Sequence, residues 1–312
     1  MARLKEWKGL SILVALALVL SLGIVAVPAI PVSAATPIYV NAGTGNDAWD
    51  GQAAAWDGTH GPKQTIQAGI DVVDASGIVN VAAGTYNENV NVNKSVDLTA
   101  NGTVDVTSAA ATGDHVFEVT ADDVNITGFD ISGAEGTIDH GLRFGYAGIF
   151  YNSVTGGKAE GNNLHDNRVN IFLNSCNTVT AKDNEALGPI SHYGNIRLKN
   201  SHYCTIEGNT VADTQYGIYL EEGTSGETDA CTYNTITGNT LSRAGAEYSQ
   251  GYGIYLKKYC NHNTVDNNSI TGWRECDLDP EGDLGAGLYI RTADGSTITN
   301  NTVSDCGWGI KL

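Results

Sequence analysis

The chain has 312 residues, and its 35 Asp and Glu against 17 Lys and Arg give a formal net charge of −18. Such an acidic chain lacks the basic footprint that nucleic-acid binding requires, so nucleic acid is excluded as a predicted partner. Its 38 glycines and single methionine, with abundant Val, Thr and Asn, suit strands joined by turns better than helices.

Residues 1–36 have the pattern of a signal peptide followed by a short leader. Three basic residues precede an apolar run over residues 9–27, and small residues at 32–34 complete a cleavage pattern. We expect cleavage, which predicts a secreted or cell-surface protein with no membrane span in the mature chain. Retention of the apolar run as a membrane anchor is the alternative.

Residues 37–100 are predicted to form an N-terminal cap and the first coils of the fold. A strand is expected at residues 37–40, and further strand patterns follow within 79–90. Between them, residues 64–74 place Ile66, Ile70 and Val73 at helical spacing, which predicts one short amphipathic helix.

Residues 101–312 repeat one short pattern. Segments resembling Gly-Ile-Tyr-Leu start at residues 148, 170, 194, 217, 253, 287 and 309, which is every 22 to 36 residues. Two short apolar–polar alternations per repeat, joined by Gly and Asn, indicate strands and tight turns. The repeats therefore predict a parallel β-solenoid in which the longer gaps are loop insertions, and the helix at 64–74 caps its open first coil.

The chain also resembles a known group of proteins. The segments IYVNAGTGND, TIQAGID and VAAGTYNENV, followed by the GIYL repeats, are similar to secreted right-handed parallel β-helix proteins of the pectate-lyase-like superfamily, over roughly residues 37–312. The resemblance implies an all-β fold, a right-handed parallel β-helix solenoid with a short N-terminal capping helix.

The resemblance does not by itself assign an activity. The superfamily includes lyases, glycoside hydrolases, esterases, epimerases and non-enzymatic surface proteins. GTYNENV is similar to a stretch of pectin methylesterases, but the downstream catalytic motifs of that family are missing here, which argues against an esterase.

One column of asparagines recurs in step with the repeats. Its members are Asn162, Asn184, Asn209, Asn239, Asn268 and Asn301. Asparagine tolerates left-handed turn conformations, and its amide can bond the turn of the next coil. We expect a structural ladder rather than a ligand site.

The six cysteines leave two interpretations open. Cys231 and Cys260 share a register on consecutive coils, and Cys276 and Cys306 do the same. Neighbouring strands lie about 4.8 Å apart, near the short end of disulfide geometry, and export permits disulfides. Buried free thiols, which behave as small apolar groups, are the equal alternative.

Two columns of side chains are expected on the outer face of one sheet. We call the first the aromatic column: Phe150, Phe172, Arg197, Tyr219, Tyr255, Tyr289 and Lys311. We call the second the charged column: Asn152, Asn174, Lys199, Glu221, Lys257 and Arg291. Exposed aromatic rings can stack on sugars, and Lys or Arg can hold carboxylates. Cross-strand stabilisation of the sheet is the structural alternative.

These columns suggest a groove for an acidic polysaccharide. The residues assigned to substrate binding are Tyr219, Tyr289, Arg197, Lys199 and Glu221, and those assigned to catalysis are Lys257, Arg291 and Tyr255. If the protein is an enzyme, β-elimination of a polyuronate is the most economical chemistry, with Lys257 or Arg291 taking the C5 proton and a tyrosine protonating the leaving oxygen.

Other functions stay open at this level. The same residues could serve C5 epimerisation, whereas hydrolysis needs two flanking acids that the columns do not supply. A non-catalytic cell-envelope or adhesion protein with the same repeats is the alternative from a different class.

One loop has the spacing of a cation site. Asp277, Asp279, Glu281 and Asp283 alternate oxygen donors as the start of a calcium loop does, so Ca²⁺ is the candidate cofactor. The sequence departs from the EF-hand pattern, and a solvated acidic loop is the alternative.

The chain ends at Leu312 within a predicted core strand. Natural solenoids usually close with an atypical terminal unit. The repeats over 101–312 are therefore expected to be truncated at the C-terminus, with further coils beyond.

Overall fold

The computed structural model describes residues 36–109, 114–135, 146–188, 194–221, 230–244, 251–274 and 285–312. The predicted signal segment, apart from residue 36, and the acidic loop at 277–283 lie outside these ranges. Within the described residues, no helix is both long and apolar enough to cross a membrane.

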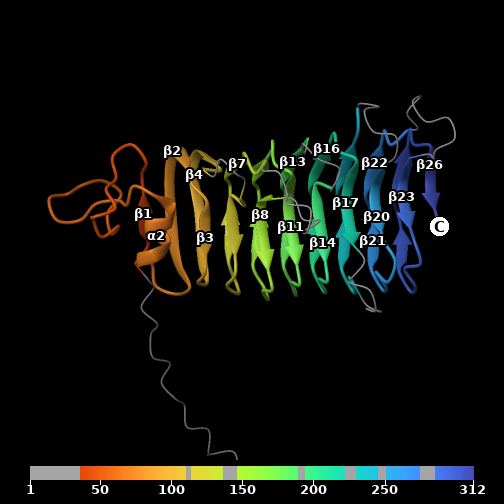
Figure 1. Ribbon diagram of the computed structural model, residues 1–312, viewed down its shortest axis with the longest axis horizontal. Coiled ribbons are helices and arrows are strands. Elements are labelled where there is room, and N and C mark those ends of the chain that lie inside the picture. The colour runs from red at the N-terminus through yellow and green to blue at the C-terminus, as the bar shows by residue number, and fades with distance from the viewer. Residues whose placement is uncertain are drawn as a thin grey trace, which may run out of the picture. The chain divides into compact units, whose positions relative to one another are not determined.

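Two parallel sheets make up nearly all of the described structure, one of 17 strands and one of nine. Successive coils lie side by side from β1 to β26, each strand pairing with its equivalent in the next coil (Figure 1). Short Gly- and Asn-bearing turns join strands whose side chains alternate between interior and surface. The predicted fold class, a right-handed parallel β-helix, is confirmed.

The nine-stranded sheet carries both outward columns. Its strands are β3 (Val90–Val92), β5 (Phe117–Val119), β8 (Ala147–Asn152), β11 (Val169–Asn174), β14 (Ile196–Lys199), β17 (Tyr216–Glu221), β20 (Tyr252–Leu256), β23 (Ala286–Ile290) and β26 (Trp308–Lys311).

The larger sheet takes two short strands from most coils. Its strands are β1 (Ile38–Val40), β2 (Gly77–Asn87), β4 (Val96–Thr107), β6 (Asn125–Thr127), β7 (Asp130–Ser132), β9 (Lys158–Glu160), β10 (Asn163–Leu164), β12 (Thr180–Lys182), β13 (Glu185–Leu187), β15 (Thr205–Glu207), β16 (Thr210–Ala212), β18 (Thr235–Thr237), β19 (Thr240–Ser242), β21 (Thr264–Asp266), β22 (Ser269–Thr271), β24 (Thr297–Thr299) and β25 (Thr302–Ser304).

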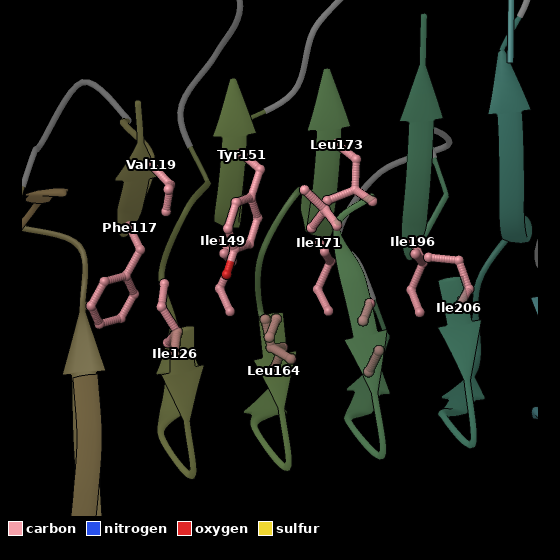
Figure 2. Close-up of a cluster of buried hydrophobic side chains, with 14 of the residues drawn as sticks. Phe117, Val119, Ile126, Ile149, Tyr151, Leu164, Ile171, Leu173, Ile196 and Ile206 are labelled. Carbon is pink, nitrogen blue, oxygen red and sulfur yellow. The ribbon is translucent and has the colours of Figure 1, made fainter. Parts of the chain in front are cut away.

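The core lies between the sheets and consists of stacked aliphatic residues. Ile149, Ile171 and Ile196 occupy one register on β8, β11 and β14 and are fully buried. Figure 2 shows them pointing into the interior toward Leu164 and Ile206 of the larger sheet. Because each coil repeats the same inward positions, the core is continuous along the solenoid.

The predicted asparagine ladder is confirmed. Each member is buried or partly buried, and from Asn184 onward its Oδ1 accepts the backbone N–H of the preceding member at 2.9–3.0 Å, whereas Asn162 Oδ1 accepts the N–H of Phe129. For example, Asn209 Oδ1 accepts from the Asn184 N–H at 3.0 Å. The Asn209 amide then donates to Ala181 O at 2.9 Å and to Asn239 Oδ1 at 3.0 Å. The column therefore satisfies turn groups that water cannot reach.

The helix predicted at 64–74 is present but shorter, as α2 (Ile66–Val72). Ile66 and Ile70 are fully buried and pack into the core beside β1 and β2. Thr65 caps the N-terminus by accepting the N–H of Ala68 at 3.2 Å, and Val73 takes an extended conformation that ends the helix. The helix covers the apolar end of the first coil, as the capping prediction requires.

The cysteines within the described residues are free thiols: Cys176, Cys204, Cys231, Cys260 and Cys306. The first four are buried in the core, so the structure favours the free-thiol interpretation. Cys276, the predicted partner of Cys306, lies outside the described residues.

Candidate functional site

The aromatic column has the register expected from the sequence. Parallel pairing aligns Phe150, Phe172, Arg197, Tyr219, Tyr255, Tyr289 and Lys311 on consecutive coils. The register is set by the repeated inward aliphatic residues on either side, because a one-residue slip would turn them outward.

The tyrosines of this column are less exposed than we expected. Tyr219 and Tyr255 are only 8% and 6% exposed, so the expectation of open aromatic faces is wrong for both. The ring centroids of Tyr219 and Tyr255 lie 5.3 Å apart, and those of Tyr255 and Tyr289 lie 4.9 Å apart, in stacked geometry. Each ring therefore covers its neighbours, while Tyr289 keeps more of its surface open.

A second row of tyrosines, which the sequence analysis missed, flanks this stack. Tyr216 and Tyr252 pair in register three residues upstream on β17 and β20. Their ring centroids lie 5.3 Å from Tyr219 and 4.9 Å from Tyr255, respectively. The signal was available, because both residues precede a Gly-Ile-Tyr-Leu segment by one position.

Burial changes the acidity of these phenols. It raises the pKa of Tyr255 to about 12, although a hydrogen bond with Arg291 acts in the opposite direction. It also raises the pKa of Tyr219, with the Glu221 carboxylate adding to the effect. Both hydroxyls therefore stay protonated near neutral pH and are available as hydrogen-bond donors.

Arg197 interrupts the aromatic column and is 1% exposed, so the expected solvent-facing contact with substrate is not available to it. Its guanidinium lies 4.9 Å from the centroid of the Phe172 ring and 5.9 Å from that of Tyr219. Its Nε donates to Glu221 Oε2 at 3.0 Å. Arg197 thus bonds Glu221 and lies between the Phe172 and Tyr219 rings. Its positive charge is therefore paired with a carboxylate inside the protein.

The charged column also follows the predicted register. Asn174, Lys199 and Glu221 align on neighbouring coils. The backbone N–H groups of Lys257 and Arg291 continue the parallel ladder, bonding to the carbonyls of Leu220 at 3.0 Å and Leu256 at 2.8 Å.

The side chains of the charged column reach solvent. Lys199, Glu221 and Lys257 are partly exposed, and Arg291 is exposed. Arg291 also bonds the hydroxyl of Tyr255, so the two columns are joined at this point. Lys257 and Arg291 therefore lie at equivalent positions of neighbouring coils, and Arg291 bonds Tyr255, while the catalytic role of these three residues stays a prediction.

The N-terminal end of the same face carries further groups. Glu118 aligns with Phe150, and burial raises the pKa of its carboxyl group. His115 stacks on Phe150 with 4.2 Å between ring centroids, and burial lowers its pKa to about 4. Neither residue lies in a Gly-Ile-Tyr-Leu segment, so the repeat pattern could not point to them.

Comparison with known proteins places the chain in a family. Residues 73–283 and 233–312 match the family model described as periplasmic copper-binding protein (NosD). The chain belongs to the NosD family. No curated protein matches this NosD-family chain significantly.

Solved structures resemble the chain in fold. An alginate lyase from Paenibacillus sp. str. FPU-7 is 12% identical with a TM-score of 0.55, and the match covers 79% of this chain and 96% of the lyase. The Dettilon tailspike protein (gp208) is 15% identical with a TM-score of 0.52, covering 86% of this chain and 62% of the tailspike. Pectate lyase Pel9A is 15% identical with a TM-score of 0.50, covering 87% and 79%. At such identities the likeness shows a shared fold and not a shared activity.

The family description raises the question of copper. Copper favours Cys, Met and His ligands, but the single methionine of the chain is Met1. Burial raises the pKa of Cys176 to about 11 and that of Cys204 to about 12, so these thiols resist forming the thiolate that a metal needs.

The histidines within the described ranges do not form a copper site either. His60 and His165 pair with neighbouring aspartates, His202 contacts the Thr232 hydroxyl at 2.7 Å, and His262 stacks on Tyr233. In the described part of the chain, no three His, Cys, Asp or Glu side chains gather as metal ligands would. The described residues therefore do not fit a copper centre. The Ca²⁺ prediction for residues 277–283 lies outside the described ranges and stays a prediction.

Proposed function

We propose that this protein is exported and binds an acidic polysaccharide along the charged column, with Tyr289 as the accessible ring beside it. The observation that carries the proposal is the alignment of Lys199, Lys257 and Arg291 on one solvent-facing column of a chain with a net charge of −18. Three cations gathered on one face of so acidic a protein favour a ligand with regularly spaced carboxylates.

The spacing of the column suits a polymer rather than a single sugar. Successive residues lie on neighbouring coils, about 4.8 Å apart along the solenoid, and the column spans several coils. Arg291 can hold a carboxylate in two-point contact while it bonds Tyr255, and Lys257 contributes a second positive charge. Arg197 no longer belongs to this binding set, because its guanidinium is buried against Glu221.

If the bound polymer is turned over, β-elimination is the reaction that these residues suit. The neutral amine form of Lys257 would take the C5 proton, the electron pair of the broken C5–H bond would form the C4–C5 double bond, and the C4–O bond would break. The leaving oxygen would receive the proton of the Tyr255 hydroxyl. Arg291 would stabilise the negative charge that develops on the carboxylate during proton removal.

The test is to incubate the purified mature protein with polygalacturonate, polymannuronate and polyguluronate, with and without Ca²⁺. Absorbance growing at about 235 nm would report the unsaturated product of elimination. Retention of a polymer without turnover would identify a non-catalytic envelope or adhesion role. Absence of both binding and turnover on every polyuronate would refute the proposal.

Variants separate the charged column from general charge effects. Lys257→Ala and Arg291→Ala should each weaken polyuronate binding, and Lys257→Ala should reduce turnover further than binding if Lys257 is the base. Lys182→Ala is the matched control, because Lys182 lies on the other sheet and pairs with Glu207 at 3.7 Å. Equal loss of binding in the control would point to net charge rather than to the column.

A further inference from the structure

A pair of tryptophans stands on the loop between β1 and α2, at the opposite end of the coils from Lys257 and Arg291. Figure 1 shows this loop in red and orange beside β1. The ring centroids of Trp49 and Trp56 lie 4.6 Å apart, with 22° between the ring planes. Nothing in the proposed polyuronate site uses this pair.

Trp56 is the outer ring of the stack and is 50% exposed. Trp49 is partly buried beneath it, and both rings lie against the backbone of Gly61, where a Cβ atom would come within 2.4 Å of Trp49 and 2.9 Å of Trp56. One face of the Trp56 indole therefore packs against the protein, and its other face meets solvent. A large, supported and exposed indole is typical of a recognition surface.

The loop is held in place by hydrogen bonds. The Gly51 N–H donates to Gly61 O at 2.9 Å, and the Asp57 N–H donates to His60 O at 3.0 Å. Asp57 Oδ1 accepts the N–H groups of Thr59 at 2.8 Å and His60 at 2.7 Å. The loop that carries Trp56 is therefore ordered before any ligand binds, which reduces the conformational entropy lost on binding.

The loop that carries Trp56 is rich in carboxylates. Asp57 directly follows Trp56 and is exposed, whereas the Asp47 carboxylate accepts hydrogen bonds from Gln64 and Thr65, and the Asp50 carboxylate pairs with His60. Carboxylates repel an anionic ligand but accept hydrogen bonds from hydroxyl groups. The surroundings of Trp56 thus select against the polyuronates expected at the charged column and favour an uncharged, hydroxyl-rich ligand.

We propose that Trp56 is the platform of a second binding site, which takes the apolar face of a neutral pyranose ring while the exposed Asp57 carboxylate accepts a hydrogen bond from one of its hydroxyls. The ligand class is a neutral hexose- or pentose-based oligosaccharide. The site stands on its own and holds whether or not the charged column binds polyuronates.

The experiment is titration of the purified mature protein with cellohexaose, mannohexaose and xylohexaose, followed by calorimetry. The parent should bind at least one of them, and Trp56→Ala should weaken that binding at least tenfold, while Trp56→Phe retains part of it. Trp308→Ala is the matched control, because Trp308 is 48% exposed on β26 and should leave binding unchanged. Thermal unfolding of each variant checks that the fold is kept.

Several outcomes would overturn the proposal. They are failure of all three oligosaccharides to bind the parent, undiminished binding by Trp56→Ala, and equal loss in Trp308→Ala. Binding of phosphatidylcholine vesicles that depends on Trp56, without sugar binding, would assign the ring to a membrane surface instead. Self-association that Trp56→Ala abolishes, again without sugar binding, would assign it to a second copy of the chain.

Discussion

Arg197 and Glu221 join the two outward columns across neighbouring coils. Arg197 belongs to the aromatic column on β14 and Glu221 to the charged column on β17, and the Arg197 Nε donates to Glu221 Oε2 at 3.0 Å. The arginine is buried, whereas the carboxylate is partly open to solvent. The contact fixes the position of one charged-column residue through a buried partner, so Glu221 has a structural role besides any contact with ligand.

Glu221→Gln should therefore destabilise the protein. The substitution removes the carboxylate charge that the buried Arg197 guanidinium bonds, and we expect a loss of about 3 kcal/mol in the free energy of unfolding. Urea denaturation of parent and variant measures the change. Glu207→Gln is the control, because the Glu207–Lys182 pair is more exposed and should be worth less than about 1 kcal/mol. Equal effects of the two substitutions would contradict a special role for the buried pair.

Tyr255 should behave as a packing residue as well as a hydrogen-bonding one. Tyr255→Ala removes a ring stacked between Tyr219 and Tyr289, and we expect it to cost about 3–5 kcal/mol of stability. Tyr255→Phe keeps the ring and loses only the bond to Arg291, at a cost of about 1 kcal/mol. Chemical denaturation distinguishes the two variants. A harmless Tyr255→Ala would show that the stack contributes nothing to the fold.

The asparagine ladder should be most sensitive at its centre. Asn209→Ala leaves the Asn184 N–H without its acceptor in the interior and removes a hydrogen bond to the Ala181 carbonyl, and we expect a loss of about 3 kcal/mol. Asn301→Ala, at the partly exposed end of the ladder, should cost only about 1 kcal/mol because water can replace the amide. Thermal or urea unfolding tests the ranking, and a larger effect at Asn301 would reverse our interpretation of the column.

His115 should make stability depend on pH in a defined window. Burial lowers the pKa of His115 from 6.5 to about 4. Between pH 6.5 and pH 4, the imidazole is therefore protonated more readily in the unfolded chain than in the folded chain. Stability is therefore retained above pH 6.5 and falls as the pH decreases toward 4, by about 2 kcal/mol at pH 5 from this group. Urea unfolding at pH 7 and pH 5 should show that His115→Phe loses less stability than the parent across this interval. An identical pH dependence in both proteins would exclude His115 as the cause.

The core cysteines should be unreactive in the folded protein. Burial raises the pKa of Cys176 and Cys204 and also that of Cys260, which keeps these thiols protonated as well as inaccessible. Iodoacetamide should label them only after denaturation, with no reductant needed. Mass spectrometry of native and denatured samples measures this, and a need for prior reduction would show that a disulfide forms instead.

Much of this fold follows from the order of residues alone. Side chains alternate along a strand, and the repeats place Ile149, Ile171 and Ile196 inward on successive coils, so the alignment of Tyr219 with Tyr255 and Tyr289 could be written down in advance. The asparagine ladder follows for the same reason, because a fixed offset within each coil becomes a column when coils stack in register.

The exposure of the columns could not be obtained in this way. Whether Tyr255 meets solvent depends on the rings of Tyr219 and Tyr289 and on the second row at Tyr252, which contact it only after the coils have stacked. The pattern of alternation tells which face a residue lies on, but not how completely its neighbours on other coils cover it.

The pairing of charged and aromatic groups likewise belongs to the tertiary structure. Arg197 lies in the aromatic column, and Glu221 lies one coil further on in the charged column, so stacking equivalent positions does not pair them. The bond between Arg291 and Tyr255 also joins one column to the other. Trp49 and Trp56 meet only because the loop folds back over Gly61.

The sequence by itself determined the coils, their register and the inward core, because these depend on periodicity. Tertiary packing decided which outward side chains are buried, paired or left open to a ligand, because those contacts depend on side-chain directions and on neighbours far apart in the chain.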